Sequence, residues 1–102
     1  MPDARFAYKI FRQESDTLLA ISDFSVIGKT FEEGDKQIVV SEDFYYGKVC
    51  NGNEAKKLIR SATIVNAVGK KIISLMVKEH IVDKDNILLI KGMPHVQVVT
   101  MW

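Results

Sequence analysis

The chain has 102 residues, of which 47% are hydrophobic and 26% charged, and its formal net charge at pH 7 is +1. This length and composition are typical of one globular domain spanning residues 1–102, and they exclude a largely disordered chain. The longest apolar runs have four residues, far short of the roughly 20 that a membrane-spanning helix needs, so we expect no membrane partner.

Charge is distributed unevenly along the sequence. Residues 1–43 contain nine acidic and five basic side chains, whereas residues 44–81 contain seven basic and two acidic ones. We therefore expect two surfaces of opposite charge, provided that the fold keeps these segments apart.

The first half of the sequence predicts mainly strands. Aromatic and β-branched residues, a polar turn and a second apolar run predict a β-hairpin. Asp23 or Ser25 would cap a short helical turn that ends at Gly28. The expected elements are strands at 6–11 and 17–21, a loop at 29–35, a strand at 36–40 and irregular structure at 41–52.

Two amphipathic helices are expected next. Asn53 is a suitable N-cap, so a first helix would span residues 53–61. Apolar residues three and four apart predict a second, largely buried helix over 63–79, with a break between the two near residue 62. Gly69 would lie inside the second helix, where glycine costs about 1 kcal/mol relative to alanine. We therefore expect Gly69 to mark the close approach of another backbone.

The C-terminal segment predicts a second hairpin. Its strands would span residues 86–91 and 96–101, and Gly92-Met93-Pro94-His95 would connect them. The order of elements predicts an α+β fold, with a mainly antiparallel or mixed sheet of about five strands and two helices packed on one face.

No complete catalytic or metal-binding motif is present. Gly28-Lys29-Thr30 lacks the first glycine of a phosphate-binding loop. Two histidines, His80 and His95, and one cysteine, Cys50, cannot complete a closed zinc site alone. We expect no metal and no cofactor, assign no catalytic residue, and interpret His80 as a helix C-cap.

Cys50 is the only cysteine in the chain. It cannot form an intrachain disulfide, and with no secretory signal at the N-terminus we expect a cytoplasmic protein. A nucleophilic pair with His95 is an alternative to a lone, unreactive thiol, because the two side chains would have to meet in space.

Basic residues recur at helical spacing on the two predicted helices. They suggest a face that binds nucleic acid through phosphate contacts, although any amphipathic helix also has a solvated polar face. The candidate nucleic-acid face comprises Lys56, Arg60, Lys70, Lys71 and Lys78.

Polar residues in three distant segments suggest a second function. Loops from these segments would converge at one end of the sheet and form a small enzyme site or ligand site. The candidate ligand site comprises Lys29, Thr30, Asp35, Asn66 and His95.

Three segments resemble one known family. Residues 28–35, 62–69 and 92–97 resemble the signature stretches of the uncharacterised archaeal domain of unknown function 424 family. The resemblance implies an archaeal, cytoplasmic, single-domain protein without an established activity, so it supplies no catalytic residue. The family commonly has glycine in the turn after the second helix, where this chain has His80.

The leading hypothesis is a noncatalytic binding module, with RNA or a ribosome-associated protein as its partner, and the alternative is the small enzyme or ligand-binding protein. A homodimer is also predicted, because Phe44-Tyr45-Tyr46 and Trp102 are large aromatic residues in an irregular stretch and at a terminus. The alternative for these rings is that they cover the open face of the sheet.

Overall fold

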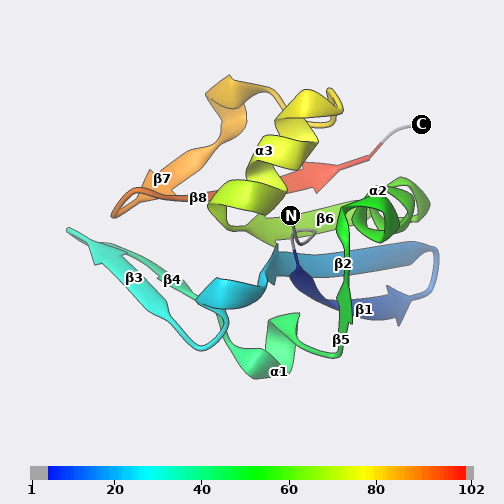
Figure 1. Ribbon diagram of the computed structural model, residues 1–102, viewed down its shortest axis with the longest axis horizontal. Coiled ribbons are helices and arrows are strands. Elements are labelled where there is room, and N and C mark those ends of the chain that lie inside the picture. The colour runs from blue at the N-terminus through cyan, green and yellow to red at the C-terminus, as the bar shows by residue number, and fades with distance from the viewer. Residues whose placement is uncertain (1–4, 101–102) are drawn as a thin grey trace.

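The computed structural model describes residues 5–100, and it confirms the α+β fold (Figure 1). Six strands form a mixed sheet in the order β5-β1-β2-β6-β8-β7, and two more form a separate hairpin. The strands of the mixed sheet are β1 (Phe6–Gln13), β2 (Asp16–Asp23), β5 (Lys48–Cys50), β6 (Ile64–Val68), β7 (Leu88–Ile90) and β8 (Met93–Val99). The separate hairpin consists of β3 (Thr30–Glu33) and β4 (Lys36–Val39). The helical elements are α1 (Glu42–Tyr45), α2 (Gly52–Ser61), α3 (Lys70–Lys78) and the 3-10 turns η1 (Phe24–Val26) and η2 (Lys84–Asn86).

The register of the sheet decides which side chains share a face. β2 pairs with β6 in parallel, and the other pairs in the mixed sheet are antiparallel. Because side chains alternate along a strand, Leu19 and Ile21 of β2 point to one face, and Ala20 and Ser22 to the other. The sheet therefore has two covered faces and a core on each.

The two long helices pack on the same face of the sheet, as predicted. Ala55 and Ile59 of α2 and Ile72 and Met76 of α3 are buried against the apolar side chains of β1, β2, β6 and β8. We call this side the helix face. No helix within residues 5–100 is long and apolar enough to cross a membrane.

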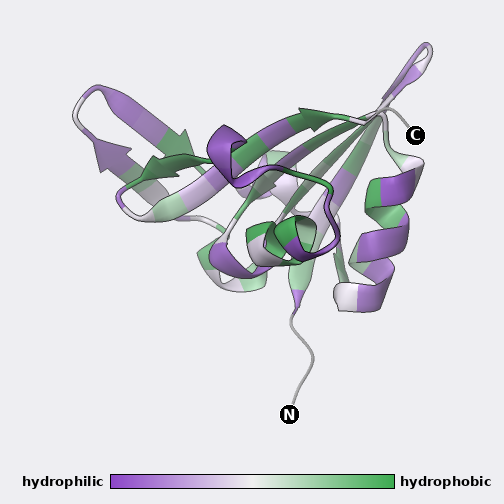
Figure 2. Cartoon of the chain, turned by 90° about the horizontal axis from the view of Figure 1, so that it is seen from above, coloured by the Kyte–Doolittle hydropathy of each residue, from purple (hydrophilic) through white to green (hydrophobic). Residues whose placement is uncertain are grey.

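The opposite face of the sheet is covered by α1 and the β3–β4 hairpin. Tyr45 of α1 and Ile38 of β4 are buried with Val68 and Ile90 of the sheet. The backbone N–H of Lys91 donates to the Glu33 carboxylate at 2.6 Å, which fixes the hairpin to the turn before β8. In Figure 2 the β3–β4 hairpin projects to the left with a hydrophilic tip. Its acidic residues therefore lie away from α2 and α3.

Two of the three rings of the aromatic triplet, Phe44 and Tyr45, cover the sheet, which was the alternative to self-association. Tyr45 is buried, and the ring of Phe44 stacks on Phe11 of β1 with centroids 5.3 Å apart. Tyr46 remains 41% exposed. Trp102, and Met101 at the end of the last predicted strand, lie outside the described residues.

The prediction of a helix over residues 63–79 is wrong in its first part. Residues Ile64–Val68 form the strand β6, between β2 and β8 at the centre of the sheet. This central strand is covered on both faces, and all of its side chains except that of Asn66 are apolar, so its sequence resembles a wide helical stripe. β3 was also missed, because only Phe31 of its four residues is partly buried.

The helix starts differ from the predicted ones. Asn51 and Glu54 form a capping box, so the N-cap of α2 is Asn51, two residues before the predicted N-cap. α3 begins after Gly69, whose φ of +129° is unsuited to a helix interior. Gly69 does mark a close approach, but by the side chain of Asp23 and not by a backbone.

The second hairpin is confirmed, with a shorter connection than predicted. Lys91 and Gly92 have φ of +55° and +78° and form the turn, as expected of two-residue hairpin loops. His95 therefore lies within β8 and not in a loop. His80, after α3, has φ of +59°, so it occupies the left-handed position that usually favours glycine.

Candidate functional site

Lysine side chains from two helices line a groove on the helix face. α2 presents Lys56, and α3 presents Lys71 and Lys78, which are two turns apart on the same side. Ser74 lies between the two α3 lysines, and the groove has a volume of about 320 Å³. We call this hollow the α2–α3 groove.

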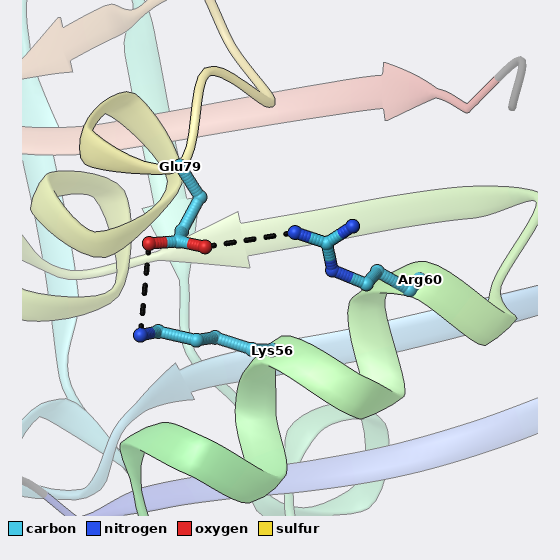
Figure 3. A network of polar contacts seen from close by, with 3 residues as sticks. All are labelled: Lys56, Arg60 and Glu79. Carbon is cyan, nitrogen blue, oxygen red and sulfur yellow. Dashed lines mark ion pairs between the residues drawn. The ribbon is translucent and has the colours of Figure 1, made fainter.

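One carboxylate in the α2–α3 groove partly balances its charge. Glu79, just after α3, lies 3.6 Å from the ammonium group of Lys56 and 3.6 Å from the guanidinium group of Arg60 (Figure 3). Both cations come from α2, so these ion pairs join the two helices. The side chains of Lys56 and Arg60 are 41% and 63% exposed, so each pair contributes little to stability.

The five residues of the predicted nucleic-acid face all lie on α2 and α3. Lys56, Lys71 and Lys78 line the groove, and Arg60 reaches it through Glu79. Lys70 is exposed in the first turn of α3 but does not line the groove. The structure therefore brings three of the five cations together around one hollow.

The N-terminus of α3 is already occupied by an acidic side chain. The carboxylate of Asp23 accepts hydrogen bonds from the backbone N–H of Lys71 at 2.9 Å and of Ile72 at 2.8 Å. Burial raises the pKa of Asp23, while these two hydrogen bonds and the charge of Lys71 oppose the rise. The N–H groups of Lys71 and Ile72 at the start of α3 are therefore already paired and do not serve a bound anion.

A polar cluster lies on the other face of the sheet. The Asn66 side-chain oxygen is 2.7 Å from the Tyr45 hydroxyl, which donates to it, and 3.0 Å from His95 Nε2. Because an amide oxygen only accepts, a neutral His95 must carry its proton on Nε2. Burial lowers the pKa of His95 and raises that of Tyr45 to about 12, so both are neutral at pH 7.

Only two residues of the predicted ligand site belong to this cluster. Asn66 and His95 are in direct contact. Lys29, Thr30 and Asp35 are exposed residues of the β3–β4 hairpin and the segment before it. None of the hydrogen bonds or ion pairs within residues 5–100 joins the side chains of these three residues to Asn66 or His95. Tyr45 was not among the predicted site residues, although it belongs to the aromatic triplet of the sequence.

Cys50 and His95 do not form a nucleophilic pair. Cys50 is buried in the core of the helix face, whereas His95 contacts Asn66 on the opposite face. Burial and the nearby charge of Glu54 raise the pKa of Cys50 to about 11, so the thiol is protonated at neutral pH. Within residues 5–100, no group of three or more His, Cys, Asp or Glu side chains is placed to hold a metal ion.

Comparisons with known proteins identify relatives without an assigned activity. A family model described as "Protein of unknown function (DUF424)" matches residues 11–101. A crystal structure of an uncharacterized conserved protein from Methanopyrus kandleri is 27% identical, with a TM-score of 0.77, and the match covers 93% of this chain and 90% of that one. No curated protein matches the chain.

Proposed function

The chain belongs to the DUF424 family of proteins of unknown function, and we propose that it is a noncatalytic module that binds the phosphate backbone of RNA through α2 and α3. The observation that carries the proposal is the α2–α3 groove, where Lys56, Lys71 and Lys78 line one hollow. Lysine ammonium groups neutralise phosphates without reading bases, so the binding would be sequence-independent.

The distribution of charge supports this assignment. The acidic β3–β4 hairpin covers the face of the sheet opposite α2 and α3. A polyanion would therefore be attracted to the helix face and repelled from the hairpin. This charge distribution would orient the protein relative to the polyanion as the two approach. Lys70 and Lys78 are exposed, so phosphates reach them at little cost in desolvation.

Glu79 provides a specific test of this proposal. Its carboxylate competes with phosphate for Lys56 and Arg60, because both cations already contact it at 3.6 Å. Replacing Glu79 with glutamine removes the competing charge and keeps the size of the side chain. RNA affinity should then rise, whereas a face that binds no anion would show no gain.

The test is fluorescence anisotropy with labelled 20-nucleotide oligouridylate between 50 and 200 mM salt. Each phosphate neutralised contributes about 0.7 to the slope of log affinity against log salt for a single strand, so three contacts give a slope near −2. Lys71→Gln with Lys78→Gln should reduce the slope to about −0.7, and Glu79→Gln should tighten binding.

The matched control is Lys29→Gln with Lys36→Gln. This pair removes the same charge from the side of the β3–β4 hairpin and should leave affinity within about twofold. Absence of binding at 50 mM salt, or equal losses in the two double variants, contradicts the proposal. Single-stranded DNA of the same length serves as the comparison that shows whether the 2′-hydroxyl contributes.

The geometry gives less support to the alternative of a small enzyme or ligand-binding protein. Of the five residues predicted for such a site, only Asn66 and His95 meet. The Asn66 oxygen already accepts two hydrogen bonds, from Tyr45 and His95. These groups satisfy one another, so the cluster is best explained as a stabilising contact between α1 and the sheet.

A further inference from the structure

A second groove lies on the other side of α3, between that helix and the edge strand β7. It has a volume of about 660 Å³, against about 320 Å³ for the α2–α3 groove. Its apolar lining comes from α3, from the segment after η2, from β7 and from β8. The apolar lining residues are Val77, Ile87, Leu89 and Pro94. We call this hollow the α3–β7 groove.

Leu89 is the most exposed apolar residue of the α3–β7 groove. It lies in the middle of β7 opposite Pro94 of β8, and it is 60% exposed, whereas Ile90 next to it is 2% exposed. Val77 and Ile87 are only partly buried beside it. A concave apolar surface formed by several elements is typical of a protein interaction site.

The polar residues of the α3–β7 groove indicate the charge of its partner. Lys78 and Lys84 line it, and none of the described lining residues is acidic. Asp83 and Asp85 flank Lys84 in sequence, but neither lines the groove, and the Asp83 carboxylate caps η2 by accepting a hydrogen bond from the Asp85 N–H at 3.3 Å. The lining contains no aromatic ring on which a nucleobase could stack.

From this combination we propose that the α3–β7 groove binds a short peptide segment of a partner protein, in which apolar side chains are flanked by aspartate or glutamate. The apolar side chains of the peptide cover Leu89, Val77 and Ile87, and its carboxylates pair with Lys78 and Lys84. Apolar burial supplies the affinity, and the lysines select acidic over basic segments. This proposal does not depend on RNA binding, although Lys78 lines both grooves.

The test uses three synthetic eight-residue peptides and the ¹⁵N-labelled protein in NMR titrations. The first peptide carries two central leucines flanked by glutamates, the second replaces the glutamates with lysines, and the third replaces the leucines with serines. The first should bind saturably and shift the amide signals of Val77, Ile87 and Leu89. The second and third should bind at least about tenfold more weakly.

Adjacent leucines of β7 provide a matched pair of variants. Leu89→Ser should weaken binding of the first peptide at least about fivefold, because Leu89 lines the groove. Leu88→Ser should leave it within about twofold, because Leu88 is 40% exposed and its side chain points to the opposite face of the sheet. Both leucines are exposed, so neither change should prevent folding, and the amide spectrum of each free variant verifies this.

Four outcomes would overturn the proposal. They are the absence of saturable binding by the first peptide, equal binding of the lysine-flanked peptide, equal losses in the two leucine variants, and a dimer in the free protein that Leu89→Ser dissociates. The last outcome would assign the groove to a second copy of the chain. RNA binding by Leu89→Ser should equal that of the unmodified protein, so the two proposals fail independently.

Discussion

Replacing Gly69 with alanine should destabilise the protein strongly, because two separate obstacles meet at this position. Gly69 has φ of +129°, a conformation that L residues rarely adopt. A Cβ atom there would also lie 2.6 Å from Asp23 Oδ1 and 2.8 Å from Asp23 Cβ. The new methyl group must therefore displace the side chain that caps α3.

The expected loss in the free energy of unfolding is the sum of these two effects. Holding a non-glycine residue in this region of φ and ψ costs about 1–3 kcal/mol. Displacing the Asp23 carboxylate breaks its hydrogen bonds to Lys71 N–H and Ile72 N–H, and losing a helix cap costs about 0.5–2 kcal/mol. We expect a total near 3 kcal/mol, a large part of the 5–15 kcal/mol typical of a small protein.

Urea unfolding followed by circular dichroism measures this loss against a matched control. Gly34 also has a positive φ, of +64°, but no heavy atom lies within 4 Å of the position of an added Cβ. Gly34→Ala should therefore cost only the backbone strain, about 1 kcal/mol. Asp23→Ala removes the carboxylate that the new methyl group would strike and leaves only the contact with Cβ at 2.8 Å, so Gly69→Ala should cost at least about 1 kcal/mol less in that background.

Two results would refute this reasoning. One is a loss for Gly69→Ala no larger than that for Gly34→Ala. The other is additivity of Gly69→Ala and Asp23→Ala to within about 0.5 kcal/mol, because contact between the two residues requires coupling.

The remaining predictions concern the polar cluster, metal independence and self-association. Tyr45→Phe should lower the free energy of unfolding by about 1 kcal/mol, because it removes the hydrogen bond to Asn66; an unchanged urea midpoint would contradict this. Burial holds the folded-state pKa of His95 below 6.5, so its contribution to stability is complete above pH 6.5 and is lost as the pH falls through the folded-state pKa. An NMR titration of the imidazole should show that lowered midpoint, and His95→Gln should abolish this part of the pH dependence. A strong chelator should leave the thermal midpoint unchanged, and a fall of more than a few degrees would reveal a metal site. Self-association stays a prediction, which light scattering at micromolar concentration tests; a mass near 11.5 kDa throughout would refute it.

Local patterns predicted the elements that polar turns or exposed faces delimit. Two apolar runs on either side of a polar turn predicted the β1–β2 hairpin, and the glycine-containing turn predicted that β7 and β8 pair. The amphipathic stripe of α2 predicted its end at Ser61, and its start to within two residues. In each case polar residues, in a turn or on one face of a helix, supply the contrast that reveals the element.

The same reasoning could not find the contacts that make up the sites. Lysine spacing predicted a shared basic face, but the α2–α3 groove exists because β6 separates α2 from α3 and returns both helices to one side of the sheet. Asn66 and His95 were both singled out, yet their contact depends on the antiparallel register of β6 and β8. The pairing of β7 with β8 places Leu89 opposite Pro94 and beside α3, which no local feature of the sequence indicated.

By itself the sequence determined the α+β class, both hairpins, α2 and the separation of acidic from basic segments. Only the tertiary structure decided that residues 64–68 are a strand, that Asp23 caps α3 from 48 residues away, and that α3 is bordered by two grooves of different chemistry. The reason is physical, since β6 is covered on both faces and its single polar residue, Asn66, is too little contrast to reveal a strand. Its structure is selected by the strands and helices that pack against it, and those partners are distant in the sequence.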